Sequence, residues 1–290
     1  MSGGAPAVAL ALVLAIAAPP PSFAQFAYED GTVPYVSTPE DVVHRMLRIA
    51  EVGPADVVVD LGSGDGRILI EAARRHGARA RGVEIDSRLA RASLEWAARA
   101  GVAERVRIET GDLFHADLSD ATVVTLYLLP EANLKLRPRL LALRPGTRVV
   151  SHDWNMGDWL PDETIEMRSP EKPVGARGAL TRVHLWVIPA DAGGRWRSEL
   201  DTHGGSWEFR IAQRYQMIEV EGRAAGREMY VRGTRLRGDE LKMVVTGTVA
   251  GRPWNHLFRG TVAGDRIDGE LTVSDGEQQR RMGWTARRIP

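Results

Sequence analysis

The stretch VVVDLGSGDGRILIEAA, residues 57–73, contains a glycine-rich turn of a kind that binds nucleotide-like ligands. An apolar run precedes the turn, a helical pattern follows it, and its glycines are Gly62, Gly64 and Gly66. At such a junction the unpaired N–H groups of the helix start favour a polar or anionic ligand, and glycines let the backbone approach it closely. The spacing G-x-G-x-G differs from the dinucleotide fingerprint G-x-G-x-x-G. The turn therefore either binds a nucleotide-like cofactor or only connects the strand tightly to the helix.

Acidic residues mark the ends of three successive predicted strands. Asp60 lies at the end of the strand before the turn, Glu84 ends the next strand in GVEID, and Asp112 follows the third in IETGDLF. Parallel strands bring their carboxyl ends to one edge of a sheet, where open α/β folds bind ligands, and an acid like Glu84 accepts hydrogen bonds from a ribose. Singly, Glu84 could be a solvated strand end and Asp112 a helix cap. Together the three acids favour a cofactor site.

The elements that position these residues alternate between short apolar runs and helical segments, which predicts a doubly wound α/β domain with a parallel sheet covered on both faces. The predicted strands are 57–61, 80–84, 106–109, 123–129, 148–151 and 181–188. The predicted helices are 67–76, 88–100 and 133–143. An earlier helix begins with Thr38 as N-cap and Pro39 at its first position, and stops at Gly53.

The character of the chain changes after a predicted linker at residues 189–194. From residue 195 to 290 no helical period is found, and turn signals recur at the spacing of a sandwich or small barrel. We therefore predict a separate antiparallel β domain built from hairpins. Its tryptophans, expected mainly in the core, are Trp196, Trp207, Trp254 and Trp284. A cap, an oligomerisation surface and the capture of a protein partner at exposed strand edges remain open as its role.

Composition narrows the classes of function. Lys and Arg together number 38, as do Asp and Glu, so the formal net charge is zero and no broad electrostatic footprint for nucleic acid exists. The chain has no cysteine, which excludes disulfides, thiolate metal sites and a cysteine nucleophile. We predict no nucleic-acid partner and no metal site.

The first 24 residues are typical of an export signal. Residues 7–18 form an apolar run of twelve, too short for the roughly 20 residues of a membrane span, and small residues precede a cleavage point after Ala24. The segment lacks the usual basic start, so an uncleaved membrane anchor and a misassigned start remain alternatives. We expect an exported, periplasmic protein whose first mature domain covers residues 25–190.

The segment DLGSGDG, with GVEID and GDLF after it, resembles motif I and the following strand ends of the class I S-adenosylmethionine-dependent methyltransferases. Residues 34–190 are more narrowly similar to bacterial relatives of the mitochondrial lysine methyltransferases that act on ATP synthase and the adenine nucleotide translocase. The resemblance implies S-adenosyl-L-methionine as cofactor and a protein lysine as acceptor, with membrane proteins among the candidate substrates. The cofactor contacts that it implies are Asp60, Gly62, Ser63, Gly64, Asp65, Gly66, Glu84, Ile85, Asp112 and Leu113.

Groups beside the transferred methyl are expected after the fourth strand and on the segment before the first helix. Our candidates for the active site or acceptor channel are Tyr35, Tyr127 and Asn133. Tyr127 could equally be a core aromatic and Tyr35 a surface anchor. The segment SHDWNMGDW, residues 151–159, is either a wall of the acceptor pocket or a loop packed under the sheet edge.

Two further functions stay open at this point. The chain could be an exported binding protein that keeps the methyltransferase fold, because S-adenosylmethionine is made in the cytoplasm. It could also methylate a small molecule, because a fold does not fix a substrate. The intact glycine turn with its acids favours the enzyme.

Overall fold

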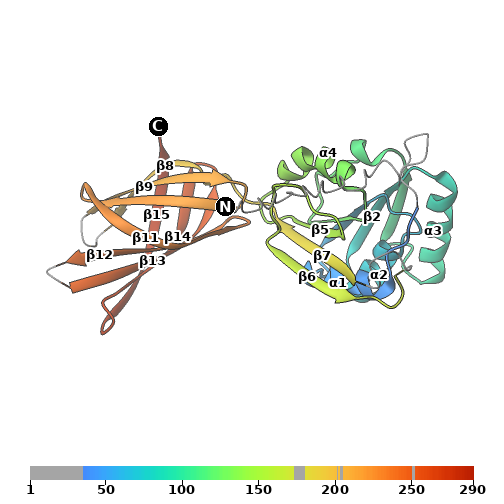
Figure 1. Cartoon of the computed structure of the whole chain (residues 1–290), viewed down its shortest axis with the longest axis horizontal. Helices are drawn as coiled ribbons and strands as arrows, with labels where there is room; N and C mark the ends of the chain where they lie inside the picture. Colours follow the sequence, from blue (N-terminus) through green and yellow to red (C-terminus); the bar gives the residue numbers. More distant parts are fainter. Residues whose placement is uncertain (1–34, 173–179, 201, 203–204, 250–251) are drawn as a thin grey trace, which may run out of the picture. The chain divides into compact units, whose positions relative to one another are not determined.

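The computed structural model describes residues 35–172, 180–200, 202, 205–249 and 252–290. An α/β domain is followed along the chain by a closed β-barrel, and both are drawn in Figure 1. The export signal predicted for residues 1–24 lies outside the described residues. None of the helices in the described ranges is both long and apolar enough to cross a membrane.

The α/β domain has one sheet of seven strands in the order β3-β2-β1-β4-β5-β7-β6. Its strands are β1 (Val57–Leu61), β2 (Arg79–Glu84), β3 (Val106–Thr110), β4 (Val123–Leu126), β5 (Arg148–His152), β6 (Glu163–Arg168) and β7 (Leu180–Val187). Strand β1 pairs in parallel with both β2 and β4, so the strand order reverses between β1 and β4. Ligands of doubly wound sheets bind at this switch point. The predicted Rossmann-like fold is confirmed, but the sheet is mixed rather than parallel throughout. Strand β7 pairs antiparallel with both β5 and β6, because no crossover helix is described between β5 and β7.

Four helices cover the two faces of this sheet, as Figure 1 shows. They are α1 (Glu40–Ile49), α2 (Arg67–His76), α3 (Ser87–Arg99) and α4 (Pro130–Leu141). The apolar side chains of α1, α2 and α3 pack on one face of the sheet. Those of α4, including Leu136 and Leu140, pack on the other face with Val59 and Leu126. Burial of these apolar stripes holds the strand ends, and the turns that follow them, in place.

Two predicted helix starts were wrong, and one strand was not predicted. Helix α1 has Pro39, not Thr38, at its N-cap, and no side chain caps it. Helix α4 begins at Pro130 rather than at residue 133, because proline suits the first position of a helix. Strand β6 was missed since it is an edge strand with mostly exposed residues, which gives no continuous apolar run.

The second half of the described chain is a closed antiparallel barrel of eight strands, which confirms the small barrel among the two predicted forms. The strands are β8 (Gly194–Leu200), β9 (Gly205–Arg214), β10 (Met217–Ala224), β11 (Arg227–Arg237), β12 (Glu240–Val249), β13 (Arg252–Ala263), β14 (Arg266–Ser274) and β15 (Gln279–Ile289). Each strand has a neighbour on both sides, so the predicted exposed edges are absent from the described barrel.

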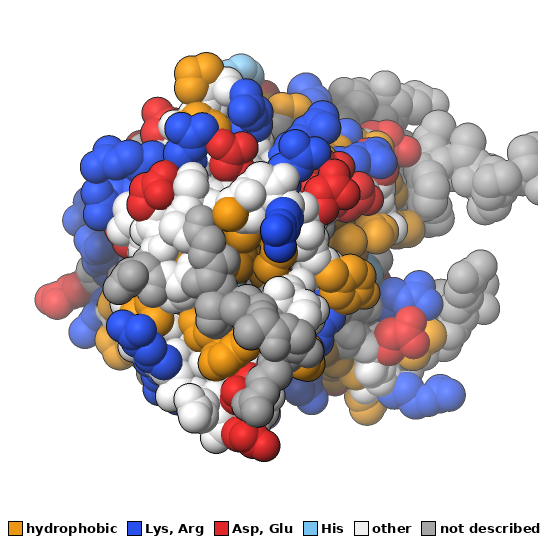
Figure 2. Space-filling view, turned by 90° about the vertical axis from the view of Figure 1, so that its left-hand side faces the viewer, with side chains coloured by type: hydrophobic (Ala, Val, Ile, Leu, Met, Phe, Trp, Pro, Cys, Tyr) orange, Lys and Arg blue, Asp and Glu red, His pale blue; other side chains and the backbone are white. Residues whose placement is uncertain are grey.

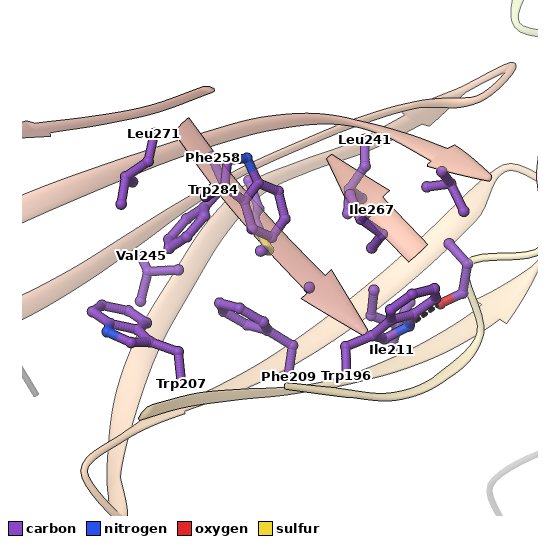
Figure 3. Close-up of a cluster of buried hydrophobic side chains, with 14 of the residues drawn as sticks. Trp196, Trp207, Phe209, Ile211, Leu241, Val245, Phe258, Ile267, Leu271 and Trp284 are labelled. Carbon is purple, nitrogen blue, oxygen red and sulfur yellow. Dashed lines mark hydrogen bonds between the residues drawn. The ribbon is translucent and has the colours of Figure 1, made fainter. Parts of the chain in front are cut away.

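Aromatic side chains fill the inside of the barrel. Trp196, Trp207, Phe258 and Trp284 are buried and point toward its axis in Figure 3. Trp254 is partly buried and packs against the same cluster. The tryptophans of this half therefore form core, as predicted.

The outside of the barrel is polar and carries both signs of charge. Arg197 pairs with Glu208 and Arg223 with Glu228 across neighbouring strands. Basic and acidic side chains also lie next to one another on the upper part of the face drawn in Figure 2. Exposed pairs of this kind contribute little stability each, and their main effect is to avoid a field of one sign.

Candidate active site

The glycine turn adopts backbone conformations that require glycine. Gly62, Gly64 and Gly66 have φ angles of 78°, 53° and 73°, in the left-handed region that other residues rarely adopt. A Cβ atom on Gly66 would lie 2.9 Å from the Cβ of Ser93, so the third glycine lets α2 pack against α3. A Cβ on Gly62 would lie 3.2 Å from a methyl group of Leu128, in the segment after β4. Because the three glycines have no side chains, the backbone at these positions is not covered by a side chain of its own at the carboxyl edge of the sheet.

Asp60 is a buried carboxylate next to this turn. It is 3% exposed, and the hydroxyl of Thr125 on β4 donates a hydrogen bond of 2.7 Å to its Oδ1. Burial raises the pKa of Asp60 to about 7, and the charges of Asp65 and Glu84 add to the effect, against the lowering influence of the Thr125 hydrogen bond. A carboxylate held at this cost in stability is typical of a functional site.

Glu84 ties the end of β2 to the glycine turn. Its Oε2 accepts from the backbone N–H of Gly64 at 2.7 Å, and its Oε1 accepts from the N–H of Asp86 at 2.9 Å. Asp112 instead accepts from the N–H of Phe114 and caps a short 3-10 helix at residues 113–115. The described structure thus places Glu84 against the turn and leaves Asp112 more exposed at the next strand end.

The remaining predicted cofactor contacts present apolar and polar groups at the same edge. Ile85 follows Glu84 and is 66% exposed, and Leu113 follows Asp112 and is partly buried. The buried hydroxyl of Ser63 has no hydrogen-bond partner among the described residues. The glycine backbone, an acid that can accept from a ribose and an exposed apolar side chain fit the parts of S-adenosylmethionine. The hydroxyl of Ser63 instead lies against Gly82 of β2, where a Cβ atom would be 2.5 Å away.

Asp65 connects the turn with the segment before α1. Its carboxylate accepts from the guanidinium of Arg67, including a contact of 2.9 Å to Nε. Nη1 of Arg67 donates to the backbone carbonyl of Thr38 at 2.8 Å. The glycine turn and the start of α1 are therefore linked through one arginine.

Tyr127 lies directly after β4 and stacks on His152, the last residue of β5. The two ring centroids are 3.9 Å apart with an angle of 29° between the planes. Burial, with a smaller contribution from the charge of Asp153, raises the pKa of Tyr127 to about 12. Burial also lowers the pKa of His152 to about 4, although Asp153 acts to raise it. At neutral pH, Tyr127 is a neutral phenol and His152 a neutral imidazole.

A directed chain of hydrogen bonds fixes the tautomer of His152. Thr181 has one hydroxyl proton, which it donates to Oδ1 of Asp153 at 2.7 Å. Its oxygen therefore accepts from Nε2 of His152, also at 2.7 Å. The proton of the imidazole is on Nε2, and Nδ1 accepts from the hydroxyl of Thr38 at 3.4 Å. Lys172 Nζ completes the chain with a 2.5 Å contact to Asp153.

The other two predicted acceptor-side residues are placed differently. Asn133 is fully buried within α4, and its amide donates to the hydroxyl of Ser151 and to the carbonyls of Trp154 and Asn155. These bonds from its nitrogen hold the segment after β5. The buried Oδ1 of Asn133 has no hydrogen-bond partner among the described residues, so its role at the acceptor side stays a prediction. Tyr35 is half exposed and belongs to the N-terminal unit of residues 1–35, so its role at the site stays a prediction.

The segment after β5 contributes more to packing than to an open wall. Met156 and Trp159 are fully buried, and Trp159 packs against Trp186 at 5.8 Å between ring centroids. The packed-loop alternative therefore holds for Trp159. Among the residues that the structure describes, no three His, Asp or Glu side chains are grouped to hold a metal ion.

Comparisons with known proteins decide the family. A family model described as ANTKMT methyltransferase domain matches residues 60–163. The chain is 49% identical over 137 residues to a protein-lysine N-methyltransferase of Saccharolobus islandicus, which covers 47% of this chain and 85% of that protein. The chain belongs to this family of methyltransferases. It is an S-adenosylmethionine-dependent methyltransferase, as the glycine turn and the resemblance predicted.

Other similar proteins are aligned over only part of their length or have a different printed activity. The mouse lysine N-methyltransferase named for ATP synthase is 36% identical over 133 residues, and the mouse adenine nucleotide translocase lysine N-methyltransferase is 37% identical over 131. The alignments cover 46% and 44% of this chain and 52% and 56% of those proteins, about half of their length. A solved structure from Salinibacter ruber, described as an RNA methyltransferase with S-adenosyl-L-homocysteine, is 52% identical, with a TM-score of 0.48, 54% of this chain covered and 95% of that chain.

The sequence interpretation missed the residues that support the main candidates. Thr125 and Thr181 are β-strand threonines that bond to Asp60 and Asp153, and Lys172 neutralises Asp153 from a distant segment. Nothing local in the sequence distinguishes the two threonines from other strand residues, and Lys172 lies in the segment between β6 and β7. Thr38 was noticed in the sequence, but for another role. Because it precedes a proline and an acidic turn, it was predicted to cap the first helix, whereas its hydroxyl contacts His152 and caps no helix.

Proposed function

We propose that this methyltransferase modifies the side-chain amine of lysine in a protein substrate. The observation that carries the proposal is its 49% identity to a protein-lysine N-methyltransferase over 85% of that protein. The glycine turn, Asp60 and Glu84, which the cofactor needs, lie within the carboxyl edge of the same domain. When bound, S-adenosylmethionine would supply a methyl group on a positively charged sulfur: the neutral amine nitrogen bonds to the methyl carbon as the methyl C–S bond breaks, S-adenosylhomocysteine leaves, and the methylated ammonium gives its proton to water.

The chain's own residues act by binding and alignment. Asp60 and Glu84 would hold polar groups of the cofactor beside the backbone of the glycine turn. Tyr127 forms a wall for the incoming lysine after β4, where its ring is already fixed against His152. Holding a nucleophile and its target in line can supply much of the rate enhancement of such a displacement.

The described residues near Tyr127 offer no free base for the lysine proton. Tyr127 stays protonated because its pKa is raised to about 12. His152 is fully buried, and its Nδ1 already accepts from Thr38. Asp153 is occupied by Lys172 and Thr181. We infer that the lysine becomes neutral as it leaves water, since burial lowers the pKa of an ammonium group.

The acceptor can be identified with labelled cofactor. The full chain is incubated with S-adenosylmethionine carrying a tritiated methyl group and, separately, with membrane proteins, soluble proteins and total RNA of its source. We expect label in methyl-lysine after acid hydrolysis of one protein fraction, and none with the Asp60→Asn variant. The Asp56→Asn variant, altered at the opposite end of β1, serves as the matched control and should retain labelling. Label in RNA alone would exclude the lysine acceptor.

We also propose that the protein is exported and periplasmic, on the basis of the apolar segment 7–18 and the small residues before position 25. A fusion to alkaline phosphatase, which is active only outside the cytoplasm, tests this: activity with the first 40 residues and none without residues 1–24 is the expected result. An inactive fusion that includes the segment would refute export. A membrane protein as acceptor belongs to the same proposal, and its test is label in the membrane fraction.

A protein partner of the barrel would have to use its outer surface. The strands form a closed circuit, so a peptide cannot add to a free strand edge of the described barrel. We therefore propose that such a partner contacts the charged exterior around pairs like Arg197 and Glu208. Crosslinking of the full chain to its partner during methyl labelling tests this contact. The same experiment is done with the double variant Arg197→Glu, Glu208→Arg. Loss of the crosslinks in that variant would support a partner bound to the outer surface of the barrel.

A further inference from the structure

Thr38 has two contacts that its expected role as a helix cap does not explain. It is 4% exposed and precedes Pro39, the N-cap residue of α1. Its carbonyl accepts from Arg67, which also binds Asp65 of the glycine turn. Its hydroxyl points the other way and donates to Nδ1 of His152. One buried residue thus contacts both the cofactor side and the acceptor side of the site.

His152 lies between Thr38 and Tyr127 and contacts both of them. Its side chain is fully buried, and both ring nitrogens are hydrogen-bonded, Nδ1 to Thr38 and Nε2 to Thr181. Two bonds at opposite edges of the ring hold the imidazole plane. Because the centroid of the Tyr127 ring lies 3.9 Å from that of His152, with 29° between the planes, the orientation of Tyr127 depends on the plane of His152.

We propose that Thr38 and His152 are positioning residues that align the Tyr127 wall with the glycine turn. Arg67 fixes the backbone of Thr38 relative to the turn, and the hydroxyl of Thr38 fixes His152 relative to the same backbone. The acceptor wall is therefore set by the segment before α1. The inference rests on the proposed methyl transfer to lysine beside Tyr127, and it adds residues that act through Tyr127 rather than on the substrate.

Thr38→Val tests the hydroxyl with almost no change in shape. The carbonyl bond from Arg67 persists, so the Kd for S-adenosylmethionine should stay within about twofold. The kcat/KM for the lysine acceptor should fall about five- to tenfold, since one buried hydrogen bond that orders the wall is lost. Thr38→Ser keeps the hydroxyl and should restore kcat/KM to within about twofold. Thr122→Val, which removes a hydroxyl bonded to Asp56 at the opposite end of the sheet, is the control for general destabilisation.

A double-mutant cycle shows whether Thr38 acts through His152. His152→Phe keeps a flat ring under Tyr127 but removes both nitrogen atoms, so it should lower kcat/KM at least as far as Thr38→Val. Adding Thr38→Val to His152→Phe should cause no further loss, because the atom that accepted the hydroxyl is gone. Losses that multiply in the double variant would overturn the proposal, as would an unchanged kcat/KM in Thr38→Val.

The same measurements separate this proposal from the function on which it rests. If the unmodified chain binds S-adenosylmethionine and methylates no lysine, the proposed function fails. If it methylates lysine and Thr38→Val does so equally well, only the positioning role fails. If Thr38→Val also loses cofactor binding by more than about tenfold, Thr38 supports the glycine turn and the assignment to the acceptor wall is wrong.

Discussion

Replacement of Asp60 by asparagine should stabilise the α/β domain while it abolishes cofactor binding. The carboxylate is 3% exposed, and its pKa is raised from its ordinary 3.8 to about 7. The native state therefore binds this proton more tightly than the unfolded state does. The contribution of Asp60 to stability is largest below pH 3.8 and is lost as the pH rises through 7. At neutral and alkaline pH, the ionised and buried carboxylate therefore lowers the free energy of unfolding.

The size of the effect follows from the two pKa values. With 1.36 kcal/mol for each pKa unit, ionisation of Asp60 costs about 4 kcal/mol of unfolding free energy at pH 8 and about 2 kcal/mol at pH 5. Asparagine carries no charge, and its Oδ1 can still accept from Thr125. The stability gain of Asp60→Asn should therefore be about 2 to 3 kcal/mol larger at pH 8 than at pH 5. Comparing two pH values removes effects of the new amide that do not depend on pH.

The assay is urea unfolding of the full chain followed by ellipticity at 222 nm. Helices of the described chain lie only in the α/β domain, so this signal reports that domain. Titration calorimetry at pH 7.5 measures S-adenosylmethionine binding by the same preparations. Asp56 is the control: burial acts to raise its pKa, but hydrogen bonds from Thr122 and Gly53 and the charge of Arg148 lower it overall. Asp56→Asn should destabilise equally at pH 5 and pH 8.

Two results would refute this reasoning. An equal stability change of Asp60→Asn at pH 5 and pH 8 would show that the carboxylate titrates normally and is not held at a cost. Unchanged S-adenosylmethionine binding would show that Asp60 is a structural residue at the strand end and not part of the cofactor site.

Three further outcomes are expected. The pKa of His152 is about 4 in the native state and 6.5 in the unfolded chain. Between pH 7 and 4.5, this group should therefore lower the unfolding free energy of the wild type by about 2 to 3 kcal/mol. Urea titrations of His152→Phe should lack that contribution. Gly269→Ala should destabilise the barrel by about 1 to 3 kcal/mol, because a Cβ there would lie 1.9 Å from the backbone oxygen of Arg259. A Cβ at Gly283 would meet nothing within 4 Å, so Gly283→Ala should be neutral. Thermal melts followed by near-ultraviolet circular dichroism distinguish the two variants. The kcat/KM for a lysine acceptor should rise about tenfold per pH unit from 6 to 9, since only the neutral amine attacks; a plateau beginning near pH 6.5 would indicate a histidine base.

Much of the cofactor site follows from the order of residues alone. The glycines at 62, 64 and 66 need left-handed backbone, and the apolar runs before each acid need a buried parallel sheet. These are local requirements, so spacing is enough to predict that Asp60, Glu84 and Asp112 follow neighbouring strands.

The acceptor side could not be predicted in the same way, because it is built from residues far apart in the chain. Thr38, Tyr127, His152 and Thr181 come from four segments and meet only when β5 pairs with β7 and α1 packs beside them. The structure places Asn133 in α4, with its amide nitrogen donating to the backbone after β5 and its buried Oδ1 without a hydrogen-bond partner among the described residues, and its role in an acceptor channel stays a prediction.

The order of the amino acids alone predicted a doubly wound methyltransferase sheet, a glycine turn after its first strand and a second, all-β domain. It did so because helical and strand periods and glycine conformations are properties of neighbouring residues. The three-dimensional packing was needed to show that the described part of the β domain closes into a barrel without free edges and that His152 is buried and neutral. Barrel closure depends on how the first and last strands meet, and the charge of a histidine depends on what surrounds it, and neither is encoded at one place in the chain.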